Sequence, residues 1–282
     1  MKIGLIGNNI SSSNAPDIHI RLAKIFQIPL EYLLFDLKDK EENYFAVLLE
    51  ELRVAGFKGV NITFPFKEKV IKHVDKISKN SRNVGSANTL IFKKKIIAQN
   101  TDYTGFLKTY NFHFGKNTPG TILVLGAGGV SRAVTFALAS LGVKKIFLID
   151  KDEIKAKSLS KDLSILNINC VVTKLDQLEK YLSSFDGIIN CTPVGHYDFP
   201  GCPLGKLMPN KKQWIFDVVY TPAKTDFIKK GEQVGAKIIS GIDLFIFQAI
   251  DAFLYFTEKK NDHILTNHIH KLRKHYFDKL YI

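Results

Sequence analysis

Short apolar runs alternate with amphipathic stretches in the first third of the chain. The apolar runs have the length of buried strands, stop at turn residues, and lie at 2–6, 32–35 and 59–63. Two stretches carry apolar residues at helical spacing, at 16–26 and 41–55. Pro16 opens the first of these helices and Gly56 follows the second, which is usual at helix ends. The β-α-β-α-β order predicts a mostly parallel sheet with helical crossovers.

The alternation pauses at residues 100–104 and starts again at Thr121. A new β-α-β unit follows, with a strand at 122–125, a helix at 129–141 and a strand at 145–149. Later elements are three strand-like runs and two closing helices, at 170–172, 187–190, 214–218, 242–256 and 262–280. We therefore expect an α/β fold of two domains, the second inserted into the first before a C-terminal helical return.

The composition is that of a globular protein. Hydrophobic residues make up 45% and charged residues 24% of the 282 residues, which excludes a disordered chain. At about 150 residues per domain, the length fits two domains. No apolar run reaches the roughly 18 residues of a membrane helix. The first residues enter a strand at once, so we expect neither a signal peptide nor a membrane partner.

The cysteines and histidines offer no metal or disulfide pattern. Three cysteines, at 170, 191 and 202, are odd in number and lack C-x-x-C spacing, so we expect a reducing cytoplasm as the location. Four histidines gather on the last helix, at 263, 268, 270 and 275. No acid or cysteine completes a metal-binding set with them, so we expect no metal.

The net charge is +13, from 40 Lys+Arg against 27 Asp+Glu. A nucleic-acid-binding protein usually concentrates its basic residues on one face. Here they are spread over predicted turns and helix ends, in clusters at 93–95, 144–145, 211–212, 229–230, 259–260 and 271–279. We interpret most of the charge as solvated lysine and expect no nucleic-acid partner. A catalytically silent protein that binds nucleotide or nucleic acid is the alternative that the charge leaves open.

A Gly-rich turn at 126–132 follows a predicted strand and opens a helix. Gly126 permits a tight turn, while Gly128 and Gly129 let a pyrophosphate reach backbone amides at the positive end of the helix. Ser131 and Arg132 are expected to cap or line the phosphate end. A turn without a ligand is the alternative, with Arg132 solvated on the helix surface.

Asp150 ends the next strand, 24 residues after Gly126. This is close to the spacing at which an acid binds the ribose of a dinucleotide. A carboxylate there accepts the ribose hydroxyls of NAD and repels the extra phosphate of NADP. Lys151 could neutralise Asp150 or meet that phosphate, and Asp150 could instead cap the following helix.

Four further segments place polar side chains where apolar runs stop, at 61–67, 86–89, 100–102 and 190–195. In open α/β sheets, ligands bind outside the carboxyl ends of the strands. Turn chemistry explains any one of these segments, because Asn, Thr and Asp favour caps and turns. Their number favours a binding site.

Together with the opening loop, these segments resemble the shikimate dehydrogenase family, which includes the quinate/shikimate dehydrogenases. The likeness runs in order over nearly the whole chain, through 7–16, 59–68, 88–89, 100–102, 126–132, 190–195, 217–222 and 241–249. The segment at 59–68, Gly-Val-Asn-Ile-Thr-Phe-Pro-Phe-Lys-Glu, is similar to the family motif that carries the catalytic lysine.

The resemblance implies two domains around a cleft. Residues 1–103 with 242–282 would form an N-terminal α/β substrate-binding and catalytic domain, and 104–241 a Rossmann-like, doubly wound NAD(P)-binding domain. The implied reaction is the reversible reduction of 3-dehydroshikimate to shikimate in the chorismate and aromatic amino acid pathway. NADP is the family's usual cofactor, whereas Asp150 favours NAD, and the expected state is a monomer or a homodimer.

The resemblance also assigns the site residues. Lys67 would be the proton donor, with Asp102 beside it to orient it and hold a substrate hydroxyl. A solvated lysine in the first turn of a helix is the alternative for Lys67. The implied substrate contacts are Ser13, Thr63, Asn88, Tyr220 and Gln248. The implied cofactor contacts are Gly126, Ala127, Gly128, Gly129, Val130, Ser131, Arg132, Asp150, Lys151, Thr192 and Gly241.

Two positions depart from the family pattern. The family usually has Ser-x-Ser-Pro in the opening loop, with both hydroxyls on the substrate carboxylate, whereas this chain has Ala15 between Asn14 and Pro16. Ser11, Ser12 or Asn14 could compensate, and a paralogue acting on quinate or a related cyclic hydroxy acid is the alternative. NADP-using members commonly have Asn-Arg-Thr where this chain has Asp-Lys-Asp at 150–152.

Overall fold

The computed structural model describes residues 1–38, 40, 44–259 and 263–281. The first residues of two predicted helices, 41–43 and 262, and Lys260 of one lysine cluster lie outside the described residues. Contacts divide the chain into two compact units, Met1–Gly105 with Phe247–Thr266, and Phe106–Ile246 with Asn267–Ile282. The boundaries fall inside three helices, α5 (Thr101–Phe114), α9 (Gly241–Thr257) and α10 (His263–Leu280).

The first unit is built on a six-stranded sheet in the order β2-β1-β3-β5-β6-β4. Its strands are β1 (Lys2–Gly7), β2 (Glu31–Asp36), β3 (Gly59–Ile62), β4 (Lys76–Ile77), β5 (Thr89–Phe92) and β6 (Ile96–Gln99). β1, β2 and β3 are parallel, as the sequence predicts. β5 is antiparallel to both β3 and β6, in a hairpin that the sequence pattern did not reveal. The turn of this hairpin is the lysine cluster at 93–95, where charged side chains are exposed.

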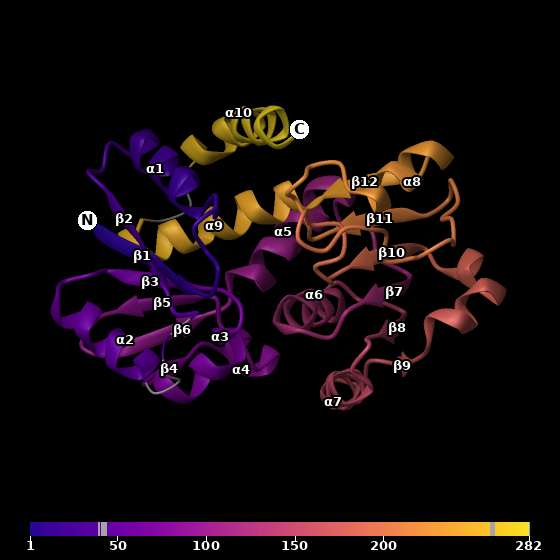
Figure 1. Ribbon diagram of the computed structural model, residues 1–282, viewed down its shortest axis with the longest axis horizontal. Helices are drawn as coiled ribbons and strands as arrows, with labels where there is room; N and C mark the ends of the chain where they lie inside the picture. Colours follow the sequence, from indigo (N-terminus) through magenta and orange to yellow (C-terminus); the bar gives the residue numbers. More distant parts are fainter. Residues whose placement is uncertain (39, 41–43, 260–262, 282) are drawn as a thin grey trace. The chain divides into compact units, whose positions relative to one another are not determined.

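Helices cover both faces of this sheet (Figure 1). On one face, α1 (Ala15–Ile25) and α9 lie against Ile3 and Leu5 of β1. On the other, α2 (Tyr44–Val54) buries four apolar side chains against β1 and β3. Short helices α3 (Phe66–Lys69) and α4 (Lys79–Val84) follow β3 and β4. The alternation of apolar side chains along β1 therefore supplies both halves of the core.

The second unit holds six parallel strands in the order β12-β11-β10-β7-β8-β9. They are β7 (Thr121–Leu125), β8 (Lys145–Ile149), β9 (Cys170–Val172), β10 (Gly187–Asn190), β11 (Trp214–Asp217) and β12 (Lys237–Ser240). The helices between them include α6 (Gly129–Ser140), α7 (Glu153–Ser164) and α8 (Asp226–Val234). This is the doubly wound order, with its switch point between β7 and β10. The predicted Rossmann-like fold is confirmed, and β12 is an edge strand that the sequence pattern did not predict.

The end of the chain belongs to a different unit than we expected. The sequence placed all of 242–282 in the first domain, whereas residues 267–282 pack within the second unit. Three contacts hold them there: Arg273 pairs with Asp243, the Tyr276 ring meets Phe245 edge-on at 5.1 Å, and the carbonyl of Leu280 accepts a hydrogen bond from the Ala223 amide. None of the helices within the described residues is long and apolar enough to cross a membrane.

Candidate active site

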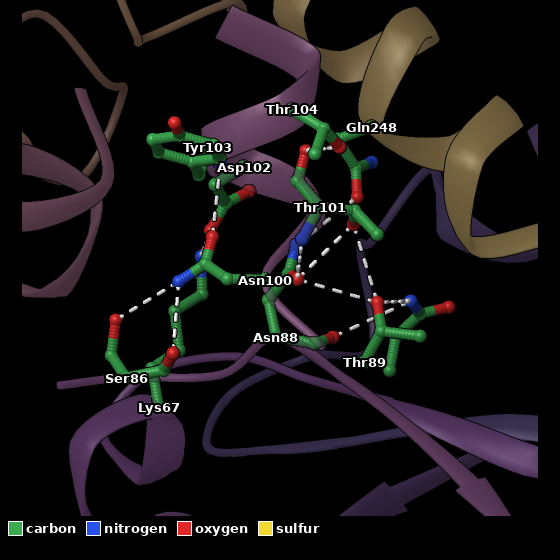
Figure 2. Close-up of polar contacts among 11 residues, drawn as sticks. Lys67, Ser86, Asn88, Thr89, Asn100, Thr101, Asp102, Tyr103, Thr104 and Gln248 are labelled. Carbon is green, nitrogen blue, oxygen red and sulfur yellow. Dashed lines mark hydrogen bonds and ion pairs between the residues drawn. The ribbon is translucent and has the colours of Figure 1, made fainter. Parts of the chain in front are cut away.

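Lys67 and Asp102 form an ion pair in the first unit (Figure 2). Lys67 Nζ lies 2.6 Å from Asp102 Oδ2, and the two side chains are only 16% and 8% exposed. Pro65 stops β3, and Phe66 then packs flat on Phe45 with ring centres 4.8 Å apart, which fixes the start of α3. Lys67 is therefore not the solvated lysine that the sequence alone allowed. Charge-assisted hydrogen bonds of this kind are roughly twice as strong as neutral ones.

Asn100 fixes the place of Asp102 (Figure 2). Its Oδ1 accepts a hydrogen bond from the Tyr103 amide at 2.9 Å, which caps the start of α5. Its Nδ2 donates to the carbonyl and the hydroxyl of Ser86, at 3.0 and 3.1 Å. The amide thus joins the segment before β5 to the helix that carries Asp102.

The amide of Asn88 has one fixed orientation. Its Oδ1 accepts hydrogen bonds from the amide of Thr101 at 2.6 Å, the hydroxyl of Thr101 at 3.1 Å and the hydroxyl of Thr89 at 3.3 Å. The oxygen is fully used, so Nδ2 is the atom left for a ligand. Nδ2 lies 3.5 Å from Oε1 of Gln248, which is half-buried on α9. This edge therefore presents a hydrogen-bond donor.

Gln248 is held in place because α9 closely approaches α5. A Cβ on Gly105 would lie 2.9 Å from the Gln248 backbone nitrogen. One turn later on α9, the carboxylate of Asp251 accepts a hydrogen bond from Thr104. Lys67, Asn88, Asp102 and Gln248, which the resemblance assigned to one site, therefore lie together. Thr89 and Thr101 were not assigned to the site from the sequence, although each follows an Asn in one of the two Asn-Thr pairs of the chain's polar segments.

The opening loop is fixed by Asp36, at the end of β2. Its carboxylate accepts hydrogen bonds from the amides of Lys38, Asn9 and Ile10, at 3.0, 3.1 and 3.2 Å. These bonds, that from Lys38 foremost, lower the pKa of Asp36. The Ser13 hydroxyl accepts a hydrogen bond from the Ala15 amide at 3.2 Å, so its proton is available to an acceptor.

Thr63 lies next to this loop, because a Cβ on Gly7 would be 2.2 Å from its Cγ2. Tyr220 belongs to the second unit, where its ring stacks on Phe245 with centres 4.7 Å apart. The structure thus brings Thr63 to the strand ends that carry Lys67, and it places Tyr220 in the unit that holds the Gly-rich turn.

The Gly-rich turn has the backbone that a pyrophosphate cradle requires. Gly126 has a φ of +102°, and a Cβ there would lie 3.0 Å from the backbone of Cys191. Gly128 precedes α6 and faces open space, and residues 128–130 are partly exposed. The first turn of α6 contains no acid and no side-chain cap. Its amides are therefore free of an internal anion, which fits a dinucleotide phosphate.

Two predicted phosphate ligands have protein partners. Ser131 donates a hydrogen bond to the Gly126 carbonyl, which closes the turn. Arg132 Nη2 lies 2.6 Å from Oδ2 of Asp162 on α7, and its side chain is only 13% exposed. The alternative of a solvated Arg132 is therefore wrong, because the guanidinium ties α6 to α7.

Asp150 joins the Gly-rich turn to the loop after β8. Oδ2 accepts a hydrogen bond from the Ala127 amide at 2.6 Å, and Oδ1 accepts one from the Asp152 amide at 2.8 Å. The cap of α7 is Asp152, which accepts from the amides of Ile154 and Lys155. The interpretation of Asp150 as the helix cap is therefore wrong. Asp150 and Asp152 lie at this turn beside the exposed Lys151, while Glu153 is paired with Lys157 and Lys174 at 3.1 and 3.0 Å.

A buried carboxyl supports the loop that carries Thr192. Asp217 accepts hydrogen bonds from Thr225 Oγ1 at 2.6 Å, Asn190 Nδ2 at 2.8 Å and the Val219 amide at 3.0 Å. Asn190 Oδ1 in turn accepts from the amide and hydroxyl of Thr192. Burial raises the pKa of Asp217 to about 7, although the three donors pull it the other way.

Gly241 closes the same region, since a Cβ there would lie 2.6 Å from the carbonyl oxygens of Asp217 and Val218. Among the described side chains, no group of three or more His, Cys, Asp or Glu residues is placed to hold a metal ion. The site chemistry is thus that of a buried Lys–Asp pair with amide donors in one unit, and a dinucleotide cradle in the other.

Comparison with known proteins identifies relatives over most of the chain. The model of the shikimate dehydrogenase substrate binding domain matches residues 5–90, and that of shikimate / quinate 5-dehydrogenase matches 111–219. A shikimate dehydrogenase (NADP(+)) of Clostridium botulinum strain Loch Maree is 33% identical over 252 residues, which are 88% of this chain and 93% of that protein.

Solved structures agree with these matches. A quinate dehydrogenase from Corynebacterium glutamicum in complex with NAD has a TM-score of 0.87 at 27% identity, covering 99% of both chains. A shikimate 5-dehydrogenase from Thermus thermophilus in complex with NADP(H) and shikimate has a TM-score of 0.81 at 26% identity, covering 98% of this chain and 99% of that one.

The buried carboxyl of Asp217 predicts a pH-dependent stability. Its pKa is about 7 in the folded chain and ordinarily 3.8, so the folded state holds the proton more tightly. Its contribution to the free energy of unfolding is complete below pH 3.8 and is lost as the pH rises through 7, at up to about 1.4 kcal/mol per pH unit. Urea unfolding of the wild-type chain and of Asp217→Asn between pH 4 and 8 measures the difference in their free energies of unfolding at each pH.

Asp176→Asn is the matched control, because this side chain is exposed in the same unit. We expect the stability difference between the wild type and Asp217→Asn to fall steadily with pH, and that for Asp176→Asn to stay nearly constant. A flat difference for Asp217→Asn contradicts the protonated carboxyl.

Proposed function

Because the chain belongs to the shikimate dehydrogenase family, we propose that it catalyses the reversible reduction of 3-dehydroshikimate to shikimate with a nicotinamide dinucleotide. The pair of Lys67 and Asp102, 2.6 Å apart and largely buried, is the observation that carries the proposal. It also argues against a catalytically silent nucleotide- or nucleic-acid-binding protein, which has no use for such a pair.

Reduction of a ketone needs a hydride on carbon and a proton on oxygen. The bound nicotinamide supplies the hydride. Lys67 Nζ donates the proton to the carbonyl oxygen as it becomes a hydroxyl, and in the oxidation direction it takes the proton back. Asp102 Oδ2 holds the ammonium group toward the reacting oxygen and accepts a hydrogen bond from a substrate hydroxyl.

The remaining polar groups would position the substrate ring. Nδ2 of Asn88 donates to a ring hydroxyl, and the Gln248 amide and the Thr63 hydroxyl contact others. The Ser13 hydroxyl donates to the carboxylate, and Tyr220 reaches the same group. For the cofactor, the backbone amides at the start of α6 would contact the phosphates. Thr192 would contact the nicotinamide end of the dinucleotide, and Asp150 the ribose.

The proposed setting is the cytoplasm, where the three thiols, which form no disulfide, stay reduced. The proposal includes no nucleic-acid or membrane partner.

Replacement of Lys67 by Ala tests the proton donor. We expect kcat for shikimate oxidation to fall by about 10²-fold or more, because general acid–base catalysis contributes that much. Shikimate affinity should change only a few-fold, since ring contacts remain. Lys72→Ala, an exposed lysine on the turn after α3, is the control and should keep full turnover. Unchanged turnover in Lys67→Ala contradicts the assignment.

Ala15 makes quinate a second candidate substrate, and one solved relative is a quinate dehydrogenase. Restoring the hydroxyl by Ala15→Ser should lower the KM for shikimate about tenfold, because a hydrogen bond to a charged group stabilises by about 1.5–3 kcal/mol. The KM for the dinucleotide, measured in the same assays, should stay constant. A shikimate KM that does not fall means that the carboxylate is held by other groups.

The carboxylates of Asp150 and Asp152 at the β8–α7 turn lead us to propose NAD as a cofactor beside the family's NADP. Asp150→Asn keeps an oxygen for the Ala127 amide and removes the charge. We expect the ratio of kcat/KM with NAD⁺ to kcat/KM with NADP⁺ to fall by about tenfold, which corresponds to about 1.4 kcal/mol. Equal changes with both cofactors show that Asp150 supports the turn alone.

A further inference from the structure

Asp251 is a buried acid that the mechanism above does not use. It lies on α9, one turn after Gln248, and is only 7% exposed. The residues around it on the helix, Ile250, Ala252 and Phe253, are apolar and buried. A carboxylate in such surroundings is costly unless it is hydrogen-bonded, whereas a leucine, which has the same branched shape, carries no such cost. The acid therefore needs a reason other than packing.

A hydrogen bond joins Asp251 to the helix of the catalytic pair. The hydroxyl of Thr104, which lies on α5 two residues after Asp102, donates to Oδ2 of Asp251. Thr104 is half-buried, and its other contact, 3.5 Å to the carbonyl of Thr101, stays within α5. The bond between Thr104 and Asp251 is thus a polar link between α5 and α9 inside the first unit.

The two helices touch at Gln248 itself. The three atoms that a Cβ on Gly105 would meet first all belong to Gln248: its backbone nitrogen at 2.9 Å, its Cβ at 3.0 Å and its Cα at 3.1 Å. Gly105 directly follows Thr104, so the hydrogen bond lies one residue away on α5 and one turn away on α9. A shift of α9 along or around α5 therefore moves Gln248, and with it the Oε1 atom that lies 3.5 Å from Nδ2 of Asn88.

We propose that Asp251 is a positioning residue for the substrate, because its hydrogen bond with Thr104 fixes the register of α9 on α5 and so holds the Gln248 amide at the ring hydroxyl that it binds. The proposal rests on the proposed function. Apolar contacts between helices tolerate small shifts, whereas a buried polar pair has one favourable alignment. Single buried polar residues set the register between helices in coiled coils in the same way, at a cost in stability.

A double substitution separates positioning from stability. Thr104→Val alone keeps the shape and leaves the buried carboxylate without this donor, so it should lower the free energy of unfolding. Adding Asp251→Leu removes the carboxylate as well, and an apolar pair in place of a buried polar pair is often neutral or stabilising. We expect the double variant to recover the stability of the wild type and still to raise the KM for shikimate about fivefold, since the Gln248 hydrogen bond is misaligned. The KM for the dinucleotide should not change.

Two variants serve as controls. Thr104→Ser keeps the donor and should retain the shikimate KM of the wild type. Thr257→Val is the matched change on α9, because the Thr257 hydroxyl donates to the Phe253 carbonyl at 2.8 Å, within the same helix. It should also leave the shikimate KM unchanged. A merely structural role of Asp251 predicts instead that the shikimate KM follows the stability and returns to the wild-type value in the double variant.

The full chain is assayed first with shikimate, without substitutions. Absence of turnover contradicts the proposed function, whereas turnover with a wild-type shikimate KM in the double variant overturns only the role of Asp251. If either Thr104→Val or the double variant does not fold, the other decides, because both lack the hydrogen bond. A raised shikimate KM in that variant then supports the proposal, and an unchanged one overturns it.

Discussion

Strand β5 runs antiparallel to β3 and β6, so its first residue lies beside the ends of both. Three polar segments that are separate in the sequence meet at this edge because the chain reverses twice between residues 59 and 99. Asn61, Thr89 and Gln99 are direct neighbours across the strands. A shift of one residue in this pairing would turn every side chain to the opposite face, so the register that builds the core also builds the site.

Buried polar side chains then fix the loops that leave the strand ends. In the first unit, Asn88 and Asn100 bind backbone groups of the segments around them, and the Lys67–Asp102 pair is held between these segments. In the second unit, carboxyl groups fix the loops. Asp150 accepts a hydrogen bond from the Ala127 amide of the Gly-rich turn, and Asp217 accepts one from the Asn190 side chain. Burial of Asp217 opposes its ionisation, which is why its pKa rises to about 7.

The sequence pattern predicted the elements whose signal is local. The strands β1, β3 and β7, the Gly-rich turn and α6 follow from apolar runs and from glycine positions, and the family motif led to Lys67. The direction of β5 was not predictable, because the three apolar residues after Thr89 fit either direction of pairing. The ion pair between Arg132 and Asp162 was not predictable for a similar reason. The two residues are 30 positions apart, and only the packing of α6 on α7 brings them together.

The docking of α10 also depends on contacts that no spacing reveals. The last helix carries no signal for either unit, and its place is decided by Asp243, which pairs with both Arg273 and His113.

The central claim is that the strand-end site of the first unit oxidises a ring hydroxyl of shikimate with a nicotinamide dinucleotide. One set of assays tests it most directly: the purified chain with shikimate and with quinate, each with NAD⁺ and with NADP⁺, followed by the absorbance of the reduced nicotinamide. The account predicts turnover of shikimate with at least one of the two cofactors. No turnover in any of the four combinations would contradict it.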